Sequence, residues 1–307
     1  MTERILVIKL AALGDFVQAF GPFAAIRAHH PGAHVTLLTT PPFAALATAS
    51  PWFDAVWTDG RPDWLDLRAV ARLALRLRRG SFTRAYDLQT SSRSSRYRLF
   101  VGASVEWSGI ARGASHPHAD AKRDHLHTVE RQRGQMIAAG IRNFPAPALD
   151  WLNSDVADFH LPEGFALMLP GASPARPGKR WPTGRFAALA QRLGMPVVIC
   201  GGPSEVPLAR EILQTAPQAL DLTGRTDLRQ LAAVARQARI AVGNDSGPVH
   251  LAAASGCPTL ALFGAESDPA LCAPRGRAVR ILRHAPLNTL DVESVLYASL
   301  GLSGGDA

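Results

Sequence analysis

Apolar runs of strand length alternate with segments of helical periodicity along most of the chain. At the start, RILVIKL (4–10) predicts a buried strand, and AALGD (11–15) predicts a glycine turn after it. The next segment, FVQAFGPFAAIRAHHPG (16–32), predicts a helix that ends at Pro31-Gly32, and AHVTLLTT (33–40) predicts a second strand. A strand, a helix and a strand in this order form the building block of a parallel sheet. The pattern continues with predicted strands at 53–59 and 82–90, helices at 63–79 and 127–141, and a loop at 112–127.

The same pattern returns after NFPAPALDWLNSDVADFHLPEG (143–164), whose prolines and turn residues predict a linker. Strands are predicted at 165–173 (with its glycine turn), 195–202, 219–224, 239–245 and 259–264, and helices at 182–194, 204–216, 227–238 and 248–255. We therefore expect an α/β protein with two doubly wound domains, 1–153 and 154–307, that face each other across a cleft. The last helix could pack back on the first domain. In such sheets, ligands bind beyond the carboxyl ends of the strands.

Composition agrees with a folded protein of two domains. The chain has 307 residues, 47% of them hydrophobic, and a mean hydropathy of +0.03, which excludes wholesale disorder. No apolar run reaches the roughly 18 residues that span a bilayer, and MTERILVIKLAALGDF lacks the features of a signal peptide. We expect a cytoplasmic protein. Its three cysteines, Cys200, Cys257 and Cys272, have no CxxC spacing, which favours reduced thiols.

The formal charge is +8, and nearly all of the positive charge is arginine. Lysine occurs only at positions 9, 122 and 179, which leaves 30 of the 33 basic residues as Arg. Such a charge suits a phosphate-bearing partner: a nucleotide, a nucleic acid or an anionic membrane surface. The stretch RLALRLRRG (72–80) has helical spacing and could equally be a solvated helix face.

Turn residues cluster between two predicted strands in GNDSGPVHL (243–251). Asp245 and Ser246 are both good N-cap residues, and a proline in the first turn favours helix initiation. Gly247 allows close approach of a ligand, and a helix N-terminus offers unpaired N–H groups to a phosphate. His250 falls in the first turn. The alternative is a well-capped core helix with a packed His250.

Two further loops follow predicted strands. LPGASPARPGKRWPTGRF (169–186) holds Lys179 beside Arg180 but lacks the GxxxxGK[ST] of a P-loop, so Lys179 is either a phosphate contact or an exposed loop charge. KLAALGD (9–15) places Lys9 and Asp15 at a strand exit. No GxGxxG occurs in the chain. Asp15 could be a helix N-cap or a general base.

Signals for a metal or for hydrolase chemistry are weak. No two aspartates are separated by one position, so the DxD of many sugar-nucleotide enzymes is absent. SHPHADAKRDHLHT (115–128) holds four histidines, His116 to His127, and favours an acceptor-facing or irregular loop over a metal site. Neither GxSxG nor HExxH is present.

Several stretches together resemble glycosyltransferase family 9, the lipopolysaccharide heptosyltransferases. They are ILVIKLAALGD (5–15), DLQTSSRSSR (87–96), HTVERQRGQMIAAG (127–140), GKRWPTGRF (178–186), GGPSE (201–205) and GNDSGPVHLAAASGCPTLALFG (243–264). The resemblance implies the GT-B fold, with two Rossmann-like domains: an acceptor-binding domain (1–153) and a nucleotide-sugar-binding domain (154–307). It also implies transfer of a heptose or related sugar from an ADP-sugar, with inversion and without metal or cofactor.

The resemblance also implies roles for individual residues. Asp15 matches the catalytic base, and Lys9, Arg93 and Arg96 match acceptor-side basic residues. Donor-side matches are Ser173, Lys179, Glu205, Asp245, Ser246, Gly247 and His250. The implied partners are a nucleotide-sugar donor, a lipid-linked glycan acceptor and the cytoplasmic face of the inner membrane, where the protein would be peripheral. No nucleic-acid motif is found. A sugar-nucleotide epimerase of the same fold and a non-catalytic nucleotide-sugar-binding protein remain alternatives.

Overall fold

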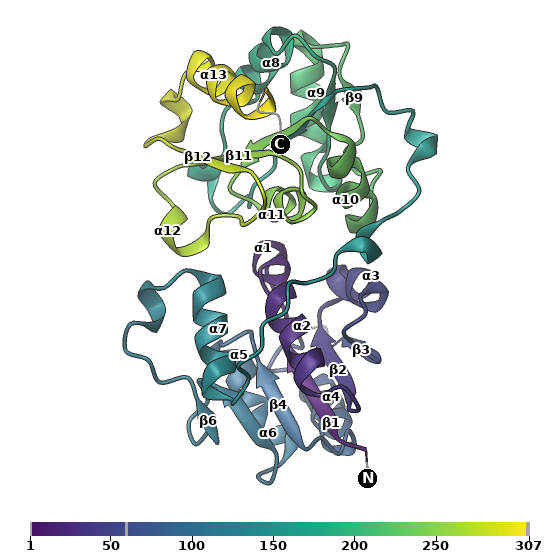
Figure 1. Cartoon of the computed structure of the whole chain (residues 1–307), viewed down its shortest axis with the longest axis vertical. Coiled ribbons are helices and arrows are strands. Elements are labelled where there is room, and N and C mark those ends of the chain that lie inside the picture. Colours follow the sequence, from purple (N-terminus) through teal and green to yellow (C-terminus); the bar gives the residue numbers. More distant parts are fainter. Residues whose placement is uncertain (1, 59–60, 305–307) are drawn as a thin grey trace. The chain divides into compact units, whose positions relative to one another are not determined.

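The computed structural model describes residues 2–58 and 61–304 and divides into two compact units, Met1–Trp151 and Leu152–Ala307. Within the described residues, each unit contains one sheet of six parallel strands with helices packed on it (Figure 1). The strand order is β3-β2-β1-β4-β5-β6 in the amino-terminal unit and β12-β11-β10-β7-β8-β9 in the carboxyl-terminal unit. Both are the Rossmann order, so the prediction of two Rossmann-like doubly wound domains is confirmed.

The amino-terminal unit follows the predicted alternation. Its strands are β1 (Arg4–Ile8), β2 (His34–Thr39), β3 (Ala55–Thr58), β4 (Arg84–Asp87), β5 (Glu106–Gly109) and β6 (His116–Pro117). Its helices are α1 (Leu13–Val17), α2 (Phe20–His29), α3 (Pro41–Ala49), α4 (Leu67–Arg79), α5 (Ser92–Arg96), α6 (Arg98–Val101) and α7 (Thr128–Ala138). The last residue of the strand predicted at 53–59 lies outside the described residues, as do the extreme termini of the predicted domains.

Two layers of helices cover this sheet. On one face, Leu73 and Leu77 of α4 and Val101 of α6 pack with Leu6 and Ile8 of β1. The other face is covered by α1, α2, α3 and α7, and its core is rich in aromatic rings; the ring centroids of Phe16 and Phe43 lie 5.2 Å apart. The burial of apolar side chains on both faces explains why the strands are almost continuously hydrophobic.

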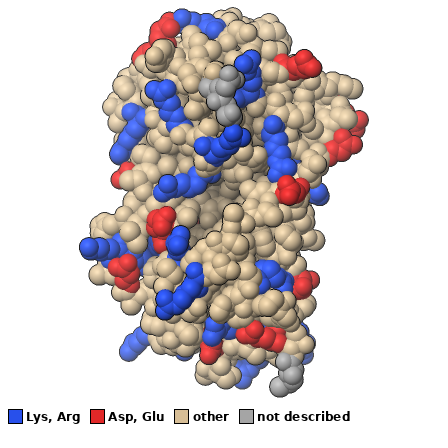
Figure 2. All heavy atoms as spheres, viewed as in Figure 1, with Lys and Arg blue, Asp and Glu red and all other residues tan. Residues whose placement is uncertain are grey.

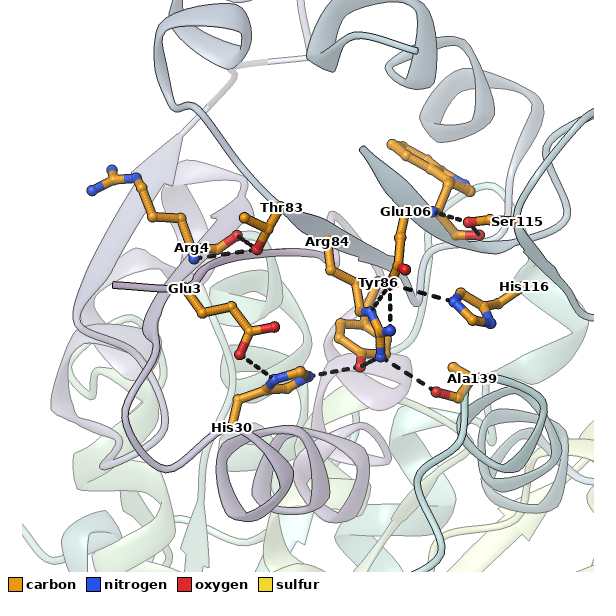
Figure 3. Close-up of polar contacts among 11 residues, drawn as sticks. Glu3, Arg4, His30, Thr83, Arg84, Tyr86, Glu106, Ser115, His116 and Ala139 are labelled. Carbon is orange, nitrogen blue, oxygen red and sulfur yellow. Dashed lines mark hydrogen bonds and ion pairs between the residues drawn. The ribbon is translucent and has the colours of Figure 1, made fainter. Parts of the chain in front are cut away.

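The amino ends of these strands are closed by a polar network (Figure 3). The buried ring of His30 lies 2.8 Å from both the Glu3 carboxylate and the Tyr86 hydroxyl. Arg84 donates to Tyr86 at 3.3 Å and pairs with Glu106 at the next strand. Burial lowers the pKa of His30, although Glu3 opposes that shift. Because its polar groups are already paired, this edge is a structural feature.

The carboxyl-terminal unit repeats the plan. Its strands are β7 (Ala166–Leu169), β8 (Val197–Ile199), β9 (Leu220–Asp221), β10 (Ile240–Asn244), β11 (Thr259–Phe263) and β12 (Val279–Arg283). Its helices are α8 (Thr183–Arg192), α9 (Val206–Thr215), α10 (Leu228–Gln237), α11 (Gly247–Ala254), α12 (Pro269–Cys272) and α13 (Val292–Ser303). The last helix, α13, packs on α8, β10 and β11, and its Val295 and Ala298 belong to the core of this unit.

The helix predicted at 16–32 is two helices in the structure. The first, α1, begins at Leu13, because the Asp15 carboxylate accepts a hydrogen bond from the Ala12 N–H at 3.3 Å. Asp15 is therefore in the first turn of a helix and not in the predicted turn at 11–15. Elements α3, α5, α6, β5, α12 and β12 were not predicted from the sequence, and a last helix was expected without bounds. The segment predicted as a loop at 112–127 contains the short strand β6 and a 3₁₀ turn at Arg123–His125.

Candidate functional site

Most of the candidate residues lie where the strand order of each sheet reverses. In the carboxyl-terminal unit this switch point lies between β7 and β10, and in the amino-terminal unit between β1 and β4. All strands in a sheet are parallel, so the loops that leave these strands emerge at the same edge. The residue ranges concerned are 170–180 and 245–250 in one unit, and 9–15 and 87–90 in the other.

In the carboxyl-terminal unit, two residues bring the loops after β7 and β10 together. A Cβ on Gly243 would lie 2.6 Å from Leu169, so only glycine allows this close approach. The side chain of Asn244 is fully buried; its oxygen accepts from the Trp181 N–H at 3.0 Å, and its NH₂ donates to the Pro170 carbonyl at 2.7 Å. Asn244 thus joins the end of β10 to both ends of the loop after β7, a role that is not evident from the sequence.

Lys179 meets Asp245 at this junction. The Lys179 Nζ lies 2.6 Å from Asp245 Oδ2, and the Ser267 hydroxyl donates to the same oxygen at 2.5 Å. Burial by itself raises the pKa of Asp245, but the His250 ring, whose Nε2 lies 3.9 Å from Asp245 Oδ1, and the hydrogen bonds from Lys179 and Ser267 outweigh burial and hold the pKa at about 2. Asp245 is therefore ionised at neutral pH, and its carboxylate fixes the position of the Lys179 ammonium. This ion pair excludes the reading of Lys179 as a freely exposed loop charge.

The N-terminus of α11 lies beside this pair and has unsatisfied polar atoms. Ser246 is the N-cap residue, yet its hydroxyl makes no capping hydrogen bond. In the described part of the chain, the Ser246 Oγ and the His250 Nδ1 are buried without a hydrogen-bond partner. Gly247 is the first helical residue and is followed by Pro248. Buried polar atoms are rarely unpaired, and a helix N-terminus attracts anions, so the arrangement suits a phosphate.

Ser173 and Glu205 lie on neighbouring loops. Ser173 is exposed in the loop after β7, whose main chain is held by two hydrogen bonds from Arg180 to the Ala172 carbonyl. Glu205 follows β8 and accepts from the Gly202 N–H and from the Ser204 hydroxyl, both at 2.8 Å. Their roles as phosphate and nucleoside contacts stay predictions.

The switch point of the amino-terminal unit contains a small polar cavity. Its lining comes from the exits of β1 and β4, from α1 and α7, and from the 3₁₀ turn at Arg123–His125. The lining residues are Lys9, Asp15, Leu88, Gln89, Thr90, Arg123, Arg131, Gln132 and Gln135. The cavity thus combines three cations with one carboxylate, and two of the residues are the predicted Lys9 and Asp15.

Lys9 is almost completely buried, and its Nζ donates to the Leu88 carbonyl at 3.2 Å. Burial lowers its pKa, the nearby Asp15 carboxylate opposes that shift, and Arg131 adds to it. The main chain after Lys9 is held by Gln89, whose side-chain oxygen accepts from the N–H groups of Leu10 and Ala11 at 2.8 and 3.0 Å. The loop that leads into α1 is therefore firmly anchored, and the first turn of α1 presents Asp15 to the cavity.

Other cavity residues were not predicted. Arg123 lies in the predicted loop at 112–127 and Arg131 in the predicted helix at 127–141, and neither pattern distinguishes these arginines from solvated charges. The Gln132 side chain is 4% exposed, and in the described residues its oxygen has no hydrogen-bond partner. Next to the cavity, burial raises the pKa of Asp87 to about 6, despite hydrogen bonds from its neighbours and the charge of Lys9. An acceptor with an anionic group and a hydroxyl donor would match this lining.

Arg93 and Arg96 lie elsewhere in the amino-terminal unit. Their guanidinium carbons are 5.0 and 5.1 Å from the centre of the Trp64 ring, and Arg93 also donates to the Pro62 carbonyl at 2.9 Å. Neither residue lines the cavity. Their acceptor-side role stays a prediction.

The histidines of 115–128 have separate surroundings. His116 lies 3.5 Å from Glu106, His118 accepts from Arg123 at 3.2 Å, and His127 caps α7. Within residues 2–58 and 61–304, no three His, Cys, Asp or Glu side chains converge as metal ligands. In the same residues, no helix is long and apolar enough to cross a membrane.

Comparison with known proteins identifies the family. The sequence model of glycosyltransferase family 9 (heptosyltransferase) matches residues 70–294, which is more than half of the chain. The chain belongs to glycosyltransferase family 9. The match includes the Lys179, Asp245 and Ser246 region but begins after Lys9 and Asp15, so it carries no information about the proposed base.

Relatives extend over the rest of the chain. Lipopolysaccharide heptosyltransferase 2 of Salmonella typhimurium is 28% identical across 91% of this chain and 88% of that protein. The structure of E. coli ADP-heptose LPS heptosyltransferase II superposes with a TM-score of 0.79 at 25% identity, covering 98% of both chains. A family 9 glycosyltransferase from Veillonella parvula has a TM-score of 0.83 at 19% identity, covering 98% of this chain and 97% of that one. This glycosyltransferase therefore has the GT-B fold, and the predicted resemblance is confirmed.

Proposed function

We propose that this glycosyltransferase moves a heptose, or a closely related sugar, from an ADP-sugar to an acceptor of the lipopolysaccharide core. The main support is the anion site in the carboxyl-terminal unit, where Lys179, the α11 N-terminus and the unpartnered Ser246 hydroxyl come together. The relative from Salmonella typhimurium is named for heptose transfer to lipopolysaccharide, and the E. coli structure for ADP-heptose. These names supply the sugar and the base, because no residue described above selects adenine.

In the proposed reaction, the donor pyrophosphate binds at this anion site. Negative charge builds up on the departing ADP as the bond to the sugar C1 breaks. The Lys179 ammonium and the N–H groups of α11 stabilise that charge more in the transition state than in the ground state. Since Asp245 already holds Lys179 by an ion pair, the ammonium needs little reorganisation when the donor binds.

Asp15 is proposed as the general base. Its carboxylate lines the cavity of the amino-terminal unit, next to the cations Lys9, Arg123 and Arg131. It takes the proton from the attacking acceptor hydroxyl, whose oxygen forms the new bond to C1 while ADP leaves from the opposite face. The cations would bind an acidic or phosphorylated part of the acceptor. Inversion at C1 follows from this single displacement.

Metal independence belongs to the same proposal. Lys179 and the α11 N-terminus supply positive charge at the place where a metal would otherwise neutralise the pyrophosphate. We expect turnover to be unchanged by EDTA. Loss of turnover that Mg²⁺ or Mn²⁺ restores would contradict this part. The acceptor is proposed to be lipid-linked, and the protein to act peripherally at the cytoplasmic face of the inner membrane.

The decisive experiment is a thermal-shift screen of ADP-, UDP- and GDP-sugars, followed by a transfer assay with lipopolysaccharide-core acceptors. We expect the largest stabilisation by ADP-heptose and a product that contains one more heptose. Conversion of the donor sugar without any acceptor would support the epimerase alternative. Donor binding without transfer to any core acceptor would favour a non-catalytic binding protein.

A further inference from the structure

Exposed leucines are concentrated on one side of the amino-terminal unit. Eight large hydrophobic side chains are exposed in the described residues, and four of them, Leu65 (89%), Leu67 (74%), Leu75 (49%) and Leu99 (75%), belong to α4, to the turn before it or to α6. These two helices pack against each other on the same face of the sheet. Single exposed leucines are ordinary, but several on one helical layer indicate an interaction surface.

The same layer is strongly basic. The thirteen residues of α4, LRAVARLALRLRR, include five arginines and no acidic residue. Arg68, Arg72 and Arg79 are exposed and recur at the i, i+4 and i+11 positions, so they form a stripe on the side of α4 opposite to the buried Leu73 and Leu77. Within residues 2–58 and 61–304, these three arginines form no ion pair with an acidic side chain. Lys and Arg occur at many places on the face drawn in Figure 2, so basic charge alone does not distinguish this layer; what it adds is four of the exposed leucines.

The turn before α4 is held in place by stacking. The Trp64 ring lies under the guanidinium groups of Arg93 and Arg96, and Asp66 caps α4 by accepting from the Ala69 N–H at 2.9 Å. Leu65 and Leu67 are therefore presented to solvent from an ordered turn. We call the set Leu65, Leu67, Arg68, Arg72, Leu75, Arg79 and Leu99 the Arg-Leu face.

We propose that the Arg-Leu face docks on an anionic phospholipid bilayer. Arginines with no carboxylate partner are complementary to lipid phosphates, and exposed leucines can enter the boundary between headgroups and acyl chains. A nucleic acid or an acidic protein segment would use the arginines, but it would leave the leucines in water. The inference rests on the proposed function only because a lipid-linked acceptor would make such docking useful. Docking itself can be measured without donor or acceptor.

The test is co-sedimentation of the full chain with vesicles of phosphatidylglycerol and phosphatidylethanolamine, and with vesicles of phosphatidylcholine alone. We expect binding to the anionic vesicles, at least about tenfold weaker binding to phosphatidylcholine, and a similar loss at 0.5 M salt. The triple variant Arg68→Gln/Arg72→Gln/Arg79→Gln should lose at least about tenfold in vesicle binding. Leu65→Ser/Leu67→Ser should weaken binding by several-fold and leave the salt dependence in place.

A matched control removes the same charge from the other unit. Arg210, Arg275 and Arg277 are exposed in the carboxyl-terminal unit, and Arg210→Gln/Arg275→Gln/Arg277→Gln should bind vesicles as the wild type does. Equal losses in both triple variants would mean that only net charge matters, and would overturn the proposal. Failure of the wild type to bind anionic vesicles would also overturn it. The same holds if the arginine substitutions reduce binding of a DNA or RNA oligonucleotide but leave vesicle binding unchanged. The unfolding temperature of each variant shows whether it is folded. An Asp15→Asn variant should still bind vesicles, so a failure of docking can be distinguished from a failure of the proposed sugar transfer.

Discussion

Each of the two switch points holds one lysine, but its relation to the candidate aspartate differs between the two units. In the carboxyl-terminal unit, Lys179 and Asp245 are in contact at 2.6 Å. In the amino-terminal unit, Lys9 donates to the Leu88 carbonyl, and Asp15 faces the cavity; among the described residues, its one hydrogen-bond donor is the Ala12 N–H at 3.3 Å. In the carboxyl-terminal unit the aspartate therefore fixes the position of the lysine, whereas in the amino-terminal unit the aspartate is the candidate reactive group.

The difference arises from how each aspartate is solvated. Asp245 is 6% exposed and receives hydrogen bonds from Lys179 and Ser267, so its carboxylate is committed to the protein. A carboxylate whose negative charge is balanced by a lysine in this way is a poor base. Asp15 is only partly buried, and its second oxygen is available to a ligand in the cavity. Four substitutions test this contrast.

Replacement of Asp15 should have the largest effect. Asp15→Asn keeps the shape of the side chain but removes the base, so we expect kcat to fall by about 10²–10⁴-fold. The affinity for ADP should stay within about twofold of the wild type, because the anion site is in the other unit. Turnover and ADP binding by calorimetry check this, with Asp63→Asn, an exposed carboxylate of the same unit, as the control. Normal turnover in Asp15→Asn would remove Asp15 from the mechanism.

Asp245→Asn should mainly reduce stability. The substitution leaves the Lys179 ammonium, whose side chain is only 12% exposed, without its counter-charge, at a cost of about 2–4 kcal/mol in the free energy of unfolding. The pKa of Asp245 is about 2, below its ordinary value of 3.8, so the stabilisation is complete above about pH 4 and is lost as the pH falls toward 2. Urea unfolding should therefore show a large difference between wild type and variant at pH 7 that shrinks near pH 2. A difference that is the same at both pH values would contradict the ion-pair account.

Lys179→Ala should weaken use of the donor. We expect kcat/KM for the ADP-sugar to fall by about 10–100-fold, which corresponds to loss of one charged contact to the pyrophosphate. Lys179→Arg keeps the charge and should recover part of the loss. The affinity for the acceptor, measured as its KM at saturating donor, should hardly change. If Lys179→Ala alters only the unfolding temperature and leaves donor kinetics intact, Lys179 is a structural residue.

Asp87→Asn should produce the smallest effect, with the opposite pH dependence. Burial raises the pKa of Asp87 from 3.8 to about 6. The folded state therefore binds this proton more tightly than the unfolded chain, and wild-type stability should rise as the pH falls from about 6 toward 4. Asp87→Asn removes this dependence and should gain about 1–3 kcal/mol relative to wild type at pH 8, but little at pH 4. Asp158→Asn, at an exposed site, should show neither effect. An unchanged pH profile in Asp87→Asn would show that Asp87 is not the group responsible.

Much of the fold could be predicted from periodicity. The alternating strands and helices, the repeat of the pattern after residue 164 and the position of Lys179 and Asp245 at strand exits all follow from local patterns, because apolar runs and turn residues are visible in the sequence. Element boundaries were less predictable. The strand predicted at 82–90 ends at Asp87, since its carboxylate accepts hydrogen bonds from the N–H groups of Gln89 and Thr90 and turns the chain.

The lining of the cavity could not be predicted in full. Arg123 and Arg131 are two of 30 arginines, and nothing local distinguishes them from solvated charges. They become cavity residues because α7 and the turn before it lie beside the exits of β1 and β4. The Arg-Leu face could be predicted in part. The amphipathic pattern of α4 is clear in the sequence, but which leucines remain exposed depends on how α6 packs beside it.

From the sequence alone follow the alternation of most strands and helices, the return of that pattern after residue 164, and the placement of lysine and aspartate at strand exits in both halves of the chain. Which lysine and aspartate form an ion pair depends on the packing of the chain. Lys179 and Asp245 are 66 positions apart, and they meet because β7 and β10 are neighbours and Asn244 joins the two loops. Local propensity has no information on such a contact, because the strength of an ion pair and the pKa of its carboxylate depend on distance and burial, which only the packed chain fixes.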